Sequence, residues 1–517
     1  MIILRELIEF KFFRYLISGG TAAAVYLALV YVLTDLAGVW YLASTTIGFV
    51  VAFLVSFSLQ KLWTFKDSRI HVAVRQLALF LSAALAGLFF NALCMYVLVE
   101  YAGIWYLLAQ VISSGALATI SFFVYSSIFH GGDKRFILVA TPLYPPDIGG
   151  PATYTKIIEE ELPKYGIPVR VLPFRVVRSF PKIFRHALFF FLTLFEGSGA
   201  RVIYAQDPVS VGLPALLASR MLRATFIVKV VGDYAWEQYS QMPDVSAEGG
   251  SASGGKGQMF LSPEEFQRKK FDIVTEVRRK IEHYVAGNAK TVIVPSAYLK
   301  RIVSAWGVPE ERIRVIYNAF NPLIAALDKR TARERLGVDG TMIFSAGRLV
   351  PWKGFEALIE VVSQLKKDFP DIRLYIAGDG PAEKDLRFKI SDLRMENTVI
   401  LTGRLQHDKL MEFVRAADVF VLNTGYEGFS HQLLEVMAFG TPVITTNIGG
   451  NPELIEDQKE GILVPYNDKE AIKRATELLL RDEALRDILV RNASEKVKVF
   501  SKEKMLRELG ELLKQST

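Results

Sequence analysis

Two glutamates, Glu427 and Glu435, lie in the stretch of this sequence with the clearest chemical pattern. The stretch covers residues 426–443 and follows a short apolar run, residues 419–422. A strand, a glycine-containing turn and a helix in this order place backbone N–H groups and the positive helix end at the carboxyl edge of a sheet, a geometry that binds phosphate. Glu435 lies about two helical turns beyond Glu427, so both carboxylates can border one crevice and accept hydrogen bonds from sugar or ribose hydroxyls. Two glutamates on a helix surface are the alternative.

Two cations, Arg348 and Lys353, follow another apolar run, residues 342–346. A diphosphate gains negative charge when its bond to a sugar breaks, and two cations can stabilise that charge without a metal. The only cysteine, Cys94, lies in a hydrophobic run, and no clustered aspartates or histidines suggest metal ligands. We therefore expect no metal and no bound cofactor. Solvated loop charges are the alternative for the two cations.

Short apolar runs alternate with helical periods from residue 136 onward, which predicts parallel sheets covered by helices. The first series comprises residues 136–140, 169–172, 202–205, 226–231 and 291–295, and the second 342–346, 373–377, 399–402, 419–422 and 443–446. Two such series predict two doubly wound lobes. We place these lobes at residues 133–318 and 319–496, with a break near residues 317–328, a flexible insert at about 245–258 and a C-terminal helix, 497–517, that rejoins the first lobe.

The first 132 residues form a separate part of the chain, because four uncharged stretches there are each long enough to cross a bilayer as a helix. They cover about residues 15–34, 40–60, 76–99 and 104–130. Lysines and arginines precede the first stretch, separate the second from the third and follow the fourth, whereas the other two loops have none. The positive-inside rule therefore puts both termini in the cytoplasm. A simple anchor is the plainest role for these helices.

Together, Arg348, Lys353, Glu427 and Glu435 resemble the pattern of the retaining GT-B glycosyltransferases of family 4. The resemblance covers about residues 135–515 and implies an α/β fold of two Rossmann-like lobes. It implies metal-independent transfer of a sugar from a nucleotide-sugar, UDP- or GDP-linked, with retention of configuration. By this resemblance the two cations hold the donor diphosphate, Glu427 faces the donor sugar and Glu435 binds the ribose. Front-face departure and attack follow, with the leaving phosphate helping to deprotonate the acceptor.

The same resemblance assigns further residues to the donor site. Gly428, Phe429 and Ser430 supply backbone contacts near the donor sugar, and Arg404 sits where the base is usually held.

The first lobe supplies three more candidates. Gly149 and Gly150 match the family's glycine turn, which lets the backbone approach donor phosphate and acceptor; a plain turn is the alternative. In residues 229–237, where many family members have a histidine, this sequence has Gly232 and Asp233 instead. Asp233 is therefore a candidate catalytic residue that contacts the donor sugar or the acceptor. A buried structural aspartate is the alternative.

The membrane part resembles the GtrA-like family over about residues 10–130, on the start Ser18-Gly19-Gly20 and the run at residues 53–65. This family is associated with polyprenyl-phosphate-linked sugars and cell-surface polysaccharides. We therefore expect a multi-pass protein of the inner cell membrane with a cytoplasmic catalytic domain. Its expected partners are membrane lipid, a nucleotide-sugar and a lipid-linked acceptor, and its modest net charge of +7 suggests no nucleic acid. The alternative is a transporter or flippase of polyprenyl-phosphate-linked sugar whose lobes only bind or regulate.

One segment of the first lobe, residues 175–195, combines four lysines or arginines with many phenylalanines. Basic residues beside bulky apolar ones are typical of a helix at an anionic membrane surface, with Arg178, Lys182 and Arg185 facing the lipid. The alternative is an ordinary helix that buries residues 189–192 against the sheet.

Overall fold

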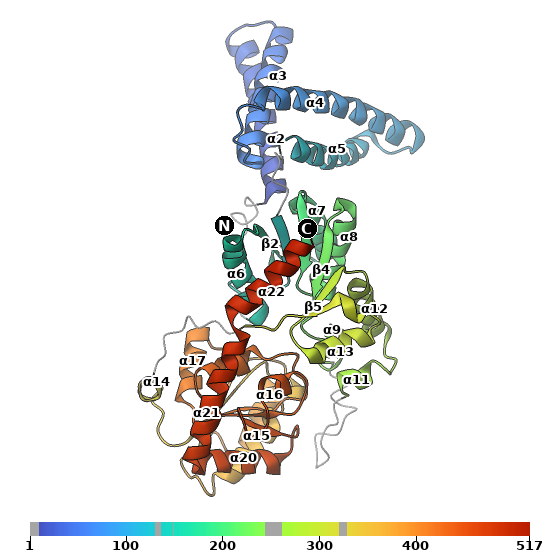
Figure 1. The fold of residues 1–517 in the computed structure, drawn as a ribbon. Helices are drawn as coiled ribbons and strands as arrows, with labels where there is room; N and C mark the ends of the chain where they lie inside the picture. The colour runs from blue at the N-terminus through green and yellow to red at the C-terminus, as the bar shows by residue number, and fades with distance from the viewer. Residues whose placement is uncertain (1–9, 130–135, 148, 243–260, 320–327, 517) are drawn as a thin grey trace.

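The structure, a computed structural model, describes residues 10–129, 136–147, 149–242, 261–319 and 328–516 (Figure 1). Its first part has four helices long and apolar enough to cross a membrane, which agree with the four predicted spans. Three of them end in a π-helical turn. The bounds are α2 Lys11–Tyr31 with η1 Val32–Leu36, α3 Tyr41–Ser58 with η2 Leu59–Thr64, α4 Ala73–Tyr96 with η3 Val97–Tyr101, and α5 Tyr106–Phe129.

These helices form two hairpins, α2 with α3 and α4 with α5. The α4–α5 hairpin leaves in a different direction from the α2–α3 hairpin (Figure 1). An aromatic cluster joins the hairpins where they meet, and its most buried members within the membrane part, each at most 9% exposed, are Phe65, Phe80, Phe122 and Phe129. The two hairpins therefore share a core at one end and diverge toward the other.

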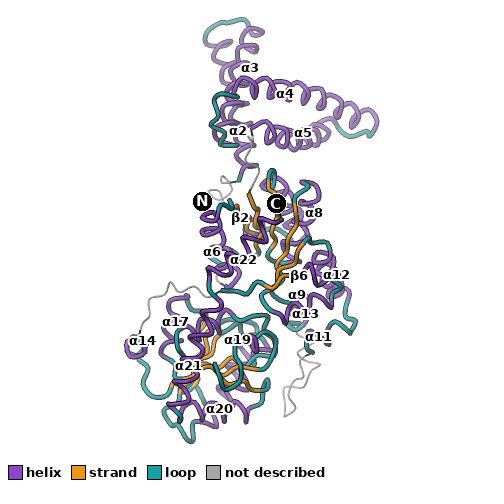
Figure 2. Tube along the Cα trace, in the orientation of Figure 1, coloured by secondary structure: helices purple, strands orange, loops and turns teal. Residues whose placement is uncertain are grey.

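The rest of the chain forms two lobes, each built on a six-stranded parallel sheet (Figure 2). The first sheet has the order β2-β1-β3-β4-β5-β6 and the second β12-β11-β10-β7-β8-β9. The N-terminal strands are β1 Phe136–Thr141, β2 Val169–Pro173, β3 Ala200–Ala205, β4 Thr225–Lys229, β5 Thr291–Val294 and β6 Ile313–Val315. The C-terminal strands are β7 Met342–Ala346, β8 Arg373–Ala377, β9 Val399–Gly403, β10 Val419–Leu422, β11 Val443–Thr446 and β12 Ile462–Val464. The predicted fold class, a helical membrane part followed by two Rossmann-like lobes, is confirmed.

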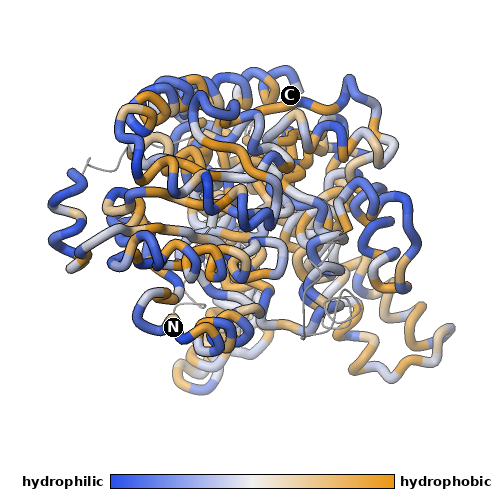
Figure 3. Tube along the Cα trace, turned by 90° about the horizontal axis from the view of Figure 1, so that it is seen from below, coloured by the Kyte–Doolittle hydropathy of each residue, from blue (hydrophilic) through white to orange (hydrophobic). Residues whose placement is uncertain are grey.

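Helices cover both sheets, and hydrophilic residues alternate with hydrophobic ones along them (Figure 3). The N-terminal lobe has α6 Gly150–Glu161, η4 Leu162–Tyr165, η5 Phe174–Val177, α7 Lys182–Glu196, η6 Pro208–Gly212, α8 Leu213–Leu222, α9 Tyr234–Tyr239, α11 Pro263–Phe266, α12 Ile273–Gly287, α13 Ala297–Ala305 and η7 Glu310–Arg312. The C-terminal lobe has α14 Lys329–Leu336, η8 Pro351–Lys353, α15 Phe355–Leu365, α16 Glu383–Asp392, α17 His407–Ala416, α18 His431–Ala438, α19 Asn451–Leu454, α20 Lys469–Arg481 and α21 Glu483–Val497. The chain ends with η9 Lys498–Phe500 and α22 Lys502–Gln515.

The C-terminal helix α22 returns to the N-terminal lobe, where its apolar side joins the core formed with α6 and β1. The chain leaves the N-terminal lobe after Tyr317 and comes back through Phe500, and these two rings lie 5.3 Å apart. Phe429 of the C-terminal lobe contacts both rings, at 5.2 and 5.5 Å between centroids. The two passages between the lobes therefore lie side by side at Tyr317 and Phe500.

Helix α7 connects the N-terminal lobe to the membrane helices. Phe195, near its C-terminal end, is 3% exposed and belongs to the aromatic cluster of the membrane part. Its ring stacks on Phe12 of α2 with centroids 4.0 Å apart and meets the edge of Phe122 of α5 at 5.0 Å. Just beyond the helix, the hydroxyls of Ser198 and Ser126 are 2.8 Å apart. The lobe is therefore docked on the helices by side-chain contacts as well as by the connecting chain.

The other residues of α7 bear on the prediction that this helix lies at a membrane surface. Phe189 and Leu192 are buried in the N-terminal core, as the ordinary-helix alternative requires. Phe184 is 69% exposed and Phe191 46% exposed, so an apolar strip remains on the surface. Arg178 donates hydrogen bonds to Asp147 of the same lobe. The helix is structural on one side, and its contact with lipid stays a prediction.

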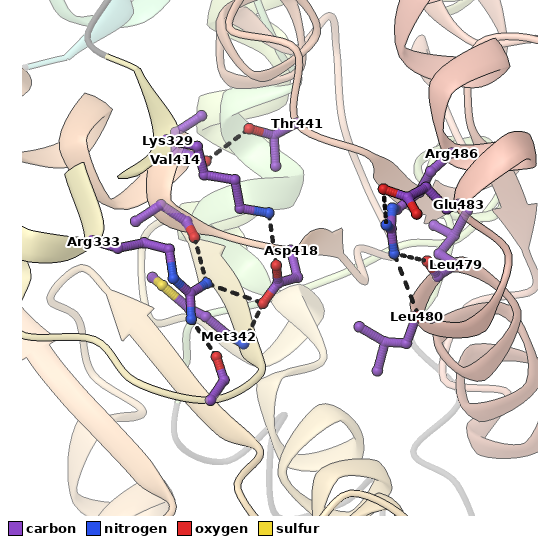
Figure 4. Close-up of polar contacts among 12 residues, drawn as sticks. Lys329, Arg333, Met342, Val414, Asp418, Thr441, Leu479, Leu480, Glu483 and Arg486 are labelled. Atoms are coloured by element: carbon purple, nitrogen blue, oxygen red, sulfur yellow. Dashed lines mark hydrogen bonds and ion pairs between the residues drawn. The ribbon is translucent and has the colours of Figure 1, made fainter. Parts of the chain in front are cut away.

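In the C-terminal lobe, Asp418 ties the first helix to the start of the sheet (Figure 4). Its carboxylate accepts from Lys329 Nζ at 2.6 Å, from Arg333 Nη1 at 3.2 Å and from the backbone N–H of Met342 at 2.8 Å. These charge-assisted bonds fix α14 against β7 and β10. They lie where β7 and β10 begin, and the candidate site lies where the same strands end.

Two strands were absent from the sequence interpretation, β6 and β12, each of three residues. They are edge strands of the two sheets and too short for an apolar period to identify. The predicted insert at 245–258, the chain between the membrane part and β1, and most of the predicted break at 317–328 lie outside the described residues.

Candidate active site

The C-terminal lobe places its candidate residues at the point where the strand order of its sheet reverses. Strands β7 and β10 are neighbours, and the sheet extends from β7 to β8 and from β10 to β11. Loops that follow two such strands diverge and leave a crevice at the carboxyl edge of the sheet. Arg348 and Lys353 follow β7, and Glu427 follows β10. The topology therefore brings together residues that lie far apart in the sequence.

Lys353 and Glu427 form an ion pair, with 2.5 Å between Nζ and Oε2. Both side chains are largely shielded from water, at 14% and 19% exposed, so this attraction is stronger than that of a surface pair. The loop after β7 is held in place by Gly354, which has a left-handed backbone with φ of 52°. A Cβ atom at this position would lie 2.3 Å from Nδ2 of Asn423, the residue that donates a hydrogen bond to the Gly354 carbonyl. A glycine is needed for the two loops to approach this closely.

The loop around Glu427 leads directly into α18. Ser430 caps this helix by accepting a hydrogen bond from the backbone N–H of Leu433 at 3.2 Å. The backbone of Glu427 and Gly428 packs against Gly449 and Gly450, where added Cβ atoms would lie 2.1 and 2.4 Å from their carbonyl oxygens. The loop is therefore fixed, and the positive end of the helix lies beside the glutamate.

A cavity of about 360 Å³ separates the two lobes at this point. Its C-terminal wall includes the predicted residues Arg348, Lys353, Glu427, Gly428, Phe429 and Ser430. Its N-terminal wall includes Gly150, Pro151, Tyr154, Gln206, Lys229, Val231 and Glu237. Seven of the predicted site residues therefore face one cavity, counting Gly150.

The two walls touch at Gly150 and His431. A Cβ atom at Gly150 would lie 2.8 Å from Cδ2 of the His431 ring, so the glycine allows the lobes to come together. Gly149, the neighbouring residue, precedes α6 with φ of 146° and lies outside the cavity lining. Of the predicted glycine turn, Gly150 is the residue that faces the C-terminal lobe.

Buried polar groups that the sequence interpretation did not select lie on the N-terminal wall. Lys229 is 2% exposed, and burial lowers its pKa to about 7. Its Nζ donates to Asn318 Oδ1 at 2.9 Å and lies 3.3 Å from the centroid of the Tyr154 ring. Burial and the charge of Lys229 lower the pKa of His431 to about 3, so this imidazole is neutral. Gln206 accepts from Thr155 at 2.6 Å, and its Nε2 has no hydrogen-bond partner among the described residues.

Asp233, predicted as catalytic, does not line the cavity. Its carboxylate accepts from the backbone N–H of Trp236 at 2.8 Å and from Gln267 Nε2 at 2.6 Å, so it caps the short helix α9. The structural alternative describes this aspartate. One helical turn later, Glu237 lines the cavity instead. The cap was the signal that sequence reasoning missed, because the residue four positions after a capping aspartate lies on the same side of the helix, one turn farther along.

Two other predicted residues also lie outside the cavity lining. Glu435 contacts His407, with 2.8 Å between Oε1 and Nε2. Arg404 lies 3.9 Å from Asp379, with half of its side chain exposed. Their assignments to ribose and base stay predictions, as does the absence of a metal. Among the described residues, no three histidines, cysteines, aspartates or glutamates gather as metal ligands would.

The fold of the two lobes is shared with a solved structure. HepE of Anabaena, in a crystal structure with UDP and glucose, matches with a TM-score of 0.58 and 20% sequence identity, over 74% of this chain and 99% of that one. The two lobes and the crevice between them therefore define the GT-B class of glycosyltransferase folds.

Family comparisons cover all three parts of the chain. Residues 14–130 match the GtrA/DPMS transmembrane domain, residues 137–319 the glycosyl transferase 4-like domain and residues 328–496 the glycosyl transferases group 1. The chain thus joins a GtrA/DPMS transmembrane domain to the two domains of a GT-B glycosyltransferase.

Curated relatives match part of the chain. An uncharacterized glycosyltransferase of Methanocaldococcus jannaschii is 30% identical over 217 residues, which are 41% of this chain and 55% of that protein. The lipopolysaccharide core biosynthesis glycosyltransferase LpsE of Rhizobium meliloti is 32% identical over 218 residues, 42% of this chain and 62% of that protein. The chain spans about half the length of the curated relatives that it matches.

Proposed function

We propose that this protein is a retaining, metal-independent glycosyltransferase of the inner membrane. It transfers a sugar from a UDP- or GDP-sugar to a lipid-linked acceptor, a polyprenyl phosphate or a lipid-linked glycan, on the cytoplasmic side. The observation that carries the proposal is the convergence of Arg348, Lys353 and Glu427 on one cavity beside the N-terminus of α18.

The donor part of the proposal follows from the charges on the C-terminal wall. The two cations suit a diphosphate, whose negative charge grows as the glycosidic bond breaks. Lys353 is paired with Glu427 in the structure. A bound diphosphate gives Lys353 a second anionic partner, and the carboxylate of Glu427 is then available to accept hydrogen bonds from sugar hydroxyls. The UDP and glucose in the HepE crystal structure support a nucleotide-sugar as the donor.

The acceptor part of the proposal follows from the way the lobe is docked. Phe195 fixes the N-terminal lobe to α2 and α5, so the cavity is held at a set position relative to the membrane helices. The exposed Phe184 and Phe191 add apolar surface on the same helix. An acceptor anchored in the bilayer has a raised effective concentration at such a site. The name of LpsE, a lipopolysaccharide core enzyme, supports an acceptor in cell-surface glycolipid synthesis.

The test is a screen of the purified full chain in lipid nanodiscs. UDP- and GDP-sugars are combined with polyprenyl phosphate and with lipid-linked glycans, in EDTA and in Mg²⁺. We expect transfer from one donor, equal rates with and without EDTA, and a product whose anomeric configuration by NMR matches that of the donor. Translocation of a lipid-linked sugar without transfer from any donor would contradict the proposal and favour the flippase alternative.

A further inference from the structure

The carboxyl group of Glu237 lies on the N-terminal wall of the cavity and is not used by the donor site described above. It belongs to α9, a helix of six residues between β4 and α11. Among the described residues its carboxylate has no hydrogen-bond partner. Gly232 makes room for it, because a Cβ atom there would lie 2.5 Å from Glu237 Oε1. The other carboxyl group in the cavity lining, Glu427, is paired with Lys353.

The surrounding structure holds Glu237 firmly. Two buried carboxylates cap α9: Asp233 accepts from the N–H of Trp236, and Glu282 accepts from those of Tyr234 and Ala235 at 2.7 and 3.1 Å. Trp236, the preceding residue, packs against Trp352 of the C-terminal lobe with ring centroids 5.1 Å apart. Trp352 lies in the loop between Arg348 and Lys353, so α9 and the predicted diphosphate loop form one packed unit across the cavity.

The charges that face Glu237 keep its proton exchangeable. Burial comes first and raises its pKa to about 7, and three carboxylates, Asp233, Glu427 and Asp207, act in the same direction. Arg348 acts against them. A catalytic base is most effective when its pKa lies near the working pH.

We infer that Glu237, in place of the leaving phosphate that the family resemblance implies, is the base that takes the proton of the acceptor, and that the acceptor nucleophile is a hydroxyl group of a lipid-linked glycan. The inference deepens the proposed function and rests on it. In this step the hydroxyl oxygen forms the bond to the anomeric carbon. The bond from that carbon to the diphosphate breaks with its electron pair on phosphate, and the hydroxyl proton passes to the Glu237 carboxylate.

The position of Glu237 decides between the two acceptors left open above. Glu237 lines the same cavity as Arg348 and Lys353, so the base faces the predicted diphosphate site, where front-face attack delivers the acceptor. A polyprenyl phosphate is already largely ionised at neutral pH, because the second pKa of a phosphate monoester is about 6, and it needs no base. A sugar hydroxyl does need one. The buried carboxyl therefore favours the hydroxyl acceptor.

Other groups in the cavity fit this role less well. The imidazole of His431 is a weak base, since its pKa is lowered to about 3 by burial and Lys229. Glu427 accepts hydrogen bonds from the donor sugar in the proposed function, and Asp233 is held by its cap contacts.

The experiment compares the wild-type chain in nanodiscs with Glu237→Gln, Glu237→Asp and the control Glu160→Gln. Glu160 is also in the N-terminal lobe, but its side chain is 58% exposed and paired only with Lys156 on α6. For transfer to a lipid-linked glycan, we expect kcat of Glu237→Gln to fall at least about 100-fold, with the KM for donor and the dissociation constant for the nucleoside diphosphate within about threefold. Glu237→Asp should retain part of the activity, and the control all of it.

The pH profile separates a base from a positioning group. Because the base must be ionised, kcat/KM of the wild type should rise with pH through about 7. The residual activity of Glu237→Gln should lack this rise. Equal transfer by wild type and Glu237→Gln, an unchanged profile, or a loss confined to donor binding would each overturn the inference. Wild-type transfer to polyprenyl phosphate alone would overturn it while the proposed function stands, and no wild-type transfer at all would overturn both.

Discussion

On the C-terminal side of the cavity, Arg348 and Lys353 present cations from one continuous loop, and Lys353 is already paired with an anion. On the N-terminal side, Lys229 and Glu237 come from a strand end and a separate helix, and burial brings the pKa of each to about 7. Burial thus lowers the pKa of the lysine and raises the pKa of the glutamate, so both lie near neutral pH. In the proposed function, the C-terminal lobe therefore holds charge for the diphosphate and the N-terminal lobe exchanges protons with the acceptor.

We expect the largest loss of activity from a substitution on the C-terminal side of the cavity. Lys353→Ala removes a cation from the proposed diphosphate site and takes away the ion-pair partner of Glu427, so kcat/KM for transfer should fall about 1000-fold, a loss of about 4 kcal/mol in transition-state stabilisation. The fold should persist, since the side chain is not part of a core. Lys367→Ala, at an exposed position of the same lobe, is the matched control. Turnover within tenfold of wild type would remove Lys353 from the site.

The contact between the two sides is tested by Gly150→Ala. The new methyl group would overlap His431, so the walls must separate slightly, and a displacement of about 1 Å can cost about 100-fold in rate. Gly287→Ala is the control, because a Cβ atom there meets nothing within 4 Å. The double variant Gly150→Ala/His431→Ala should recover activity relative to Gly150→Ala. Activity measurements that show no recovery would contradict the steric explanation.

The pH dependence of stability tests the lowered pKa of Lys229 on the N-terminal side of the cavity. Burial lowers the pKa of Lys229 to about 7 from an ordinary value of about 10.4, so the unfolded chain binds more protons between these values. The free energy of unfolding should therefore rise with pH across this window, by up to about 1.4 kcal/mol per pH unit, relative to Lys229→Met. Urea unfolding of both proteins in detergent at pH 7, 8 and 9 measures the difference. Parallel pH dependences would show that folding does not lower the pKa of Lys229.

We expect the smallest effect on activity from a substitution at Asp418, whose charge stabilises the C-terminal lobe away from the candidate site. Although burial opposes it, Lys329 and Arg333 lower the pKa of Asp418 (Figure 4). A lowered carboxyl pKa adds stability above its unfolded value of about 3.9, and this stability is lost as the pH falls through the folded value. Asp418→Asn should cost about 1 kcal/mol at pH 7 by thermal unfolding, with kcat/KM within twofold of wild type. A large loss of activity would mean that these charges also organise the site.

The sequence could predict that Arg348, Lys353 and Glu427 meet because these residues occur in two continuous stretches, whereas the predicted Glu435 and Arg404 lie outside the cavity lining. Each stretch directly follows an apolar strand, so the side chains must lie at the carboxyl edge of the sheet. Arg348, Lys353 and Glu427 need only that local order to meet. The four membrane helices were predictable for a similar reason, since length and hydropathy alone identify them.

The N-terminal side could not be predicted in the same way. Gln206, Lys229 and Glu237 are separated by helices, and only packing brings them to one wall. Asp233 attracted the prediction because it follows a strand, yet capping turns its carboxylate into α9. The docking of Phe195 on the membrane helices was also beyond the sequence pattern, since the same amphipathic helix could equally have faced lipid or the sheet.

The two neighbouring passages between the lobes have a mechanical consequence. Because Tyr317 and Phe500 lie side by side, both connections between the lobes pass through one place. We expect the C-terminal lobe to rotate most easily about this hinge. Such a rotation would open the cavity on the side away from Tyr317 and Phe500. Phe429 contacts both rings and also lines the cavity, so the loop that carries Glu427 ends beside the rotation axis, where we expect the smallest displacement.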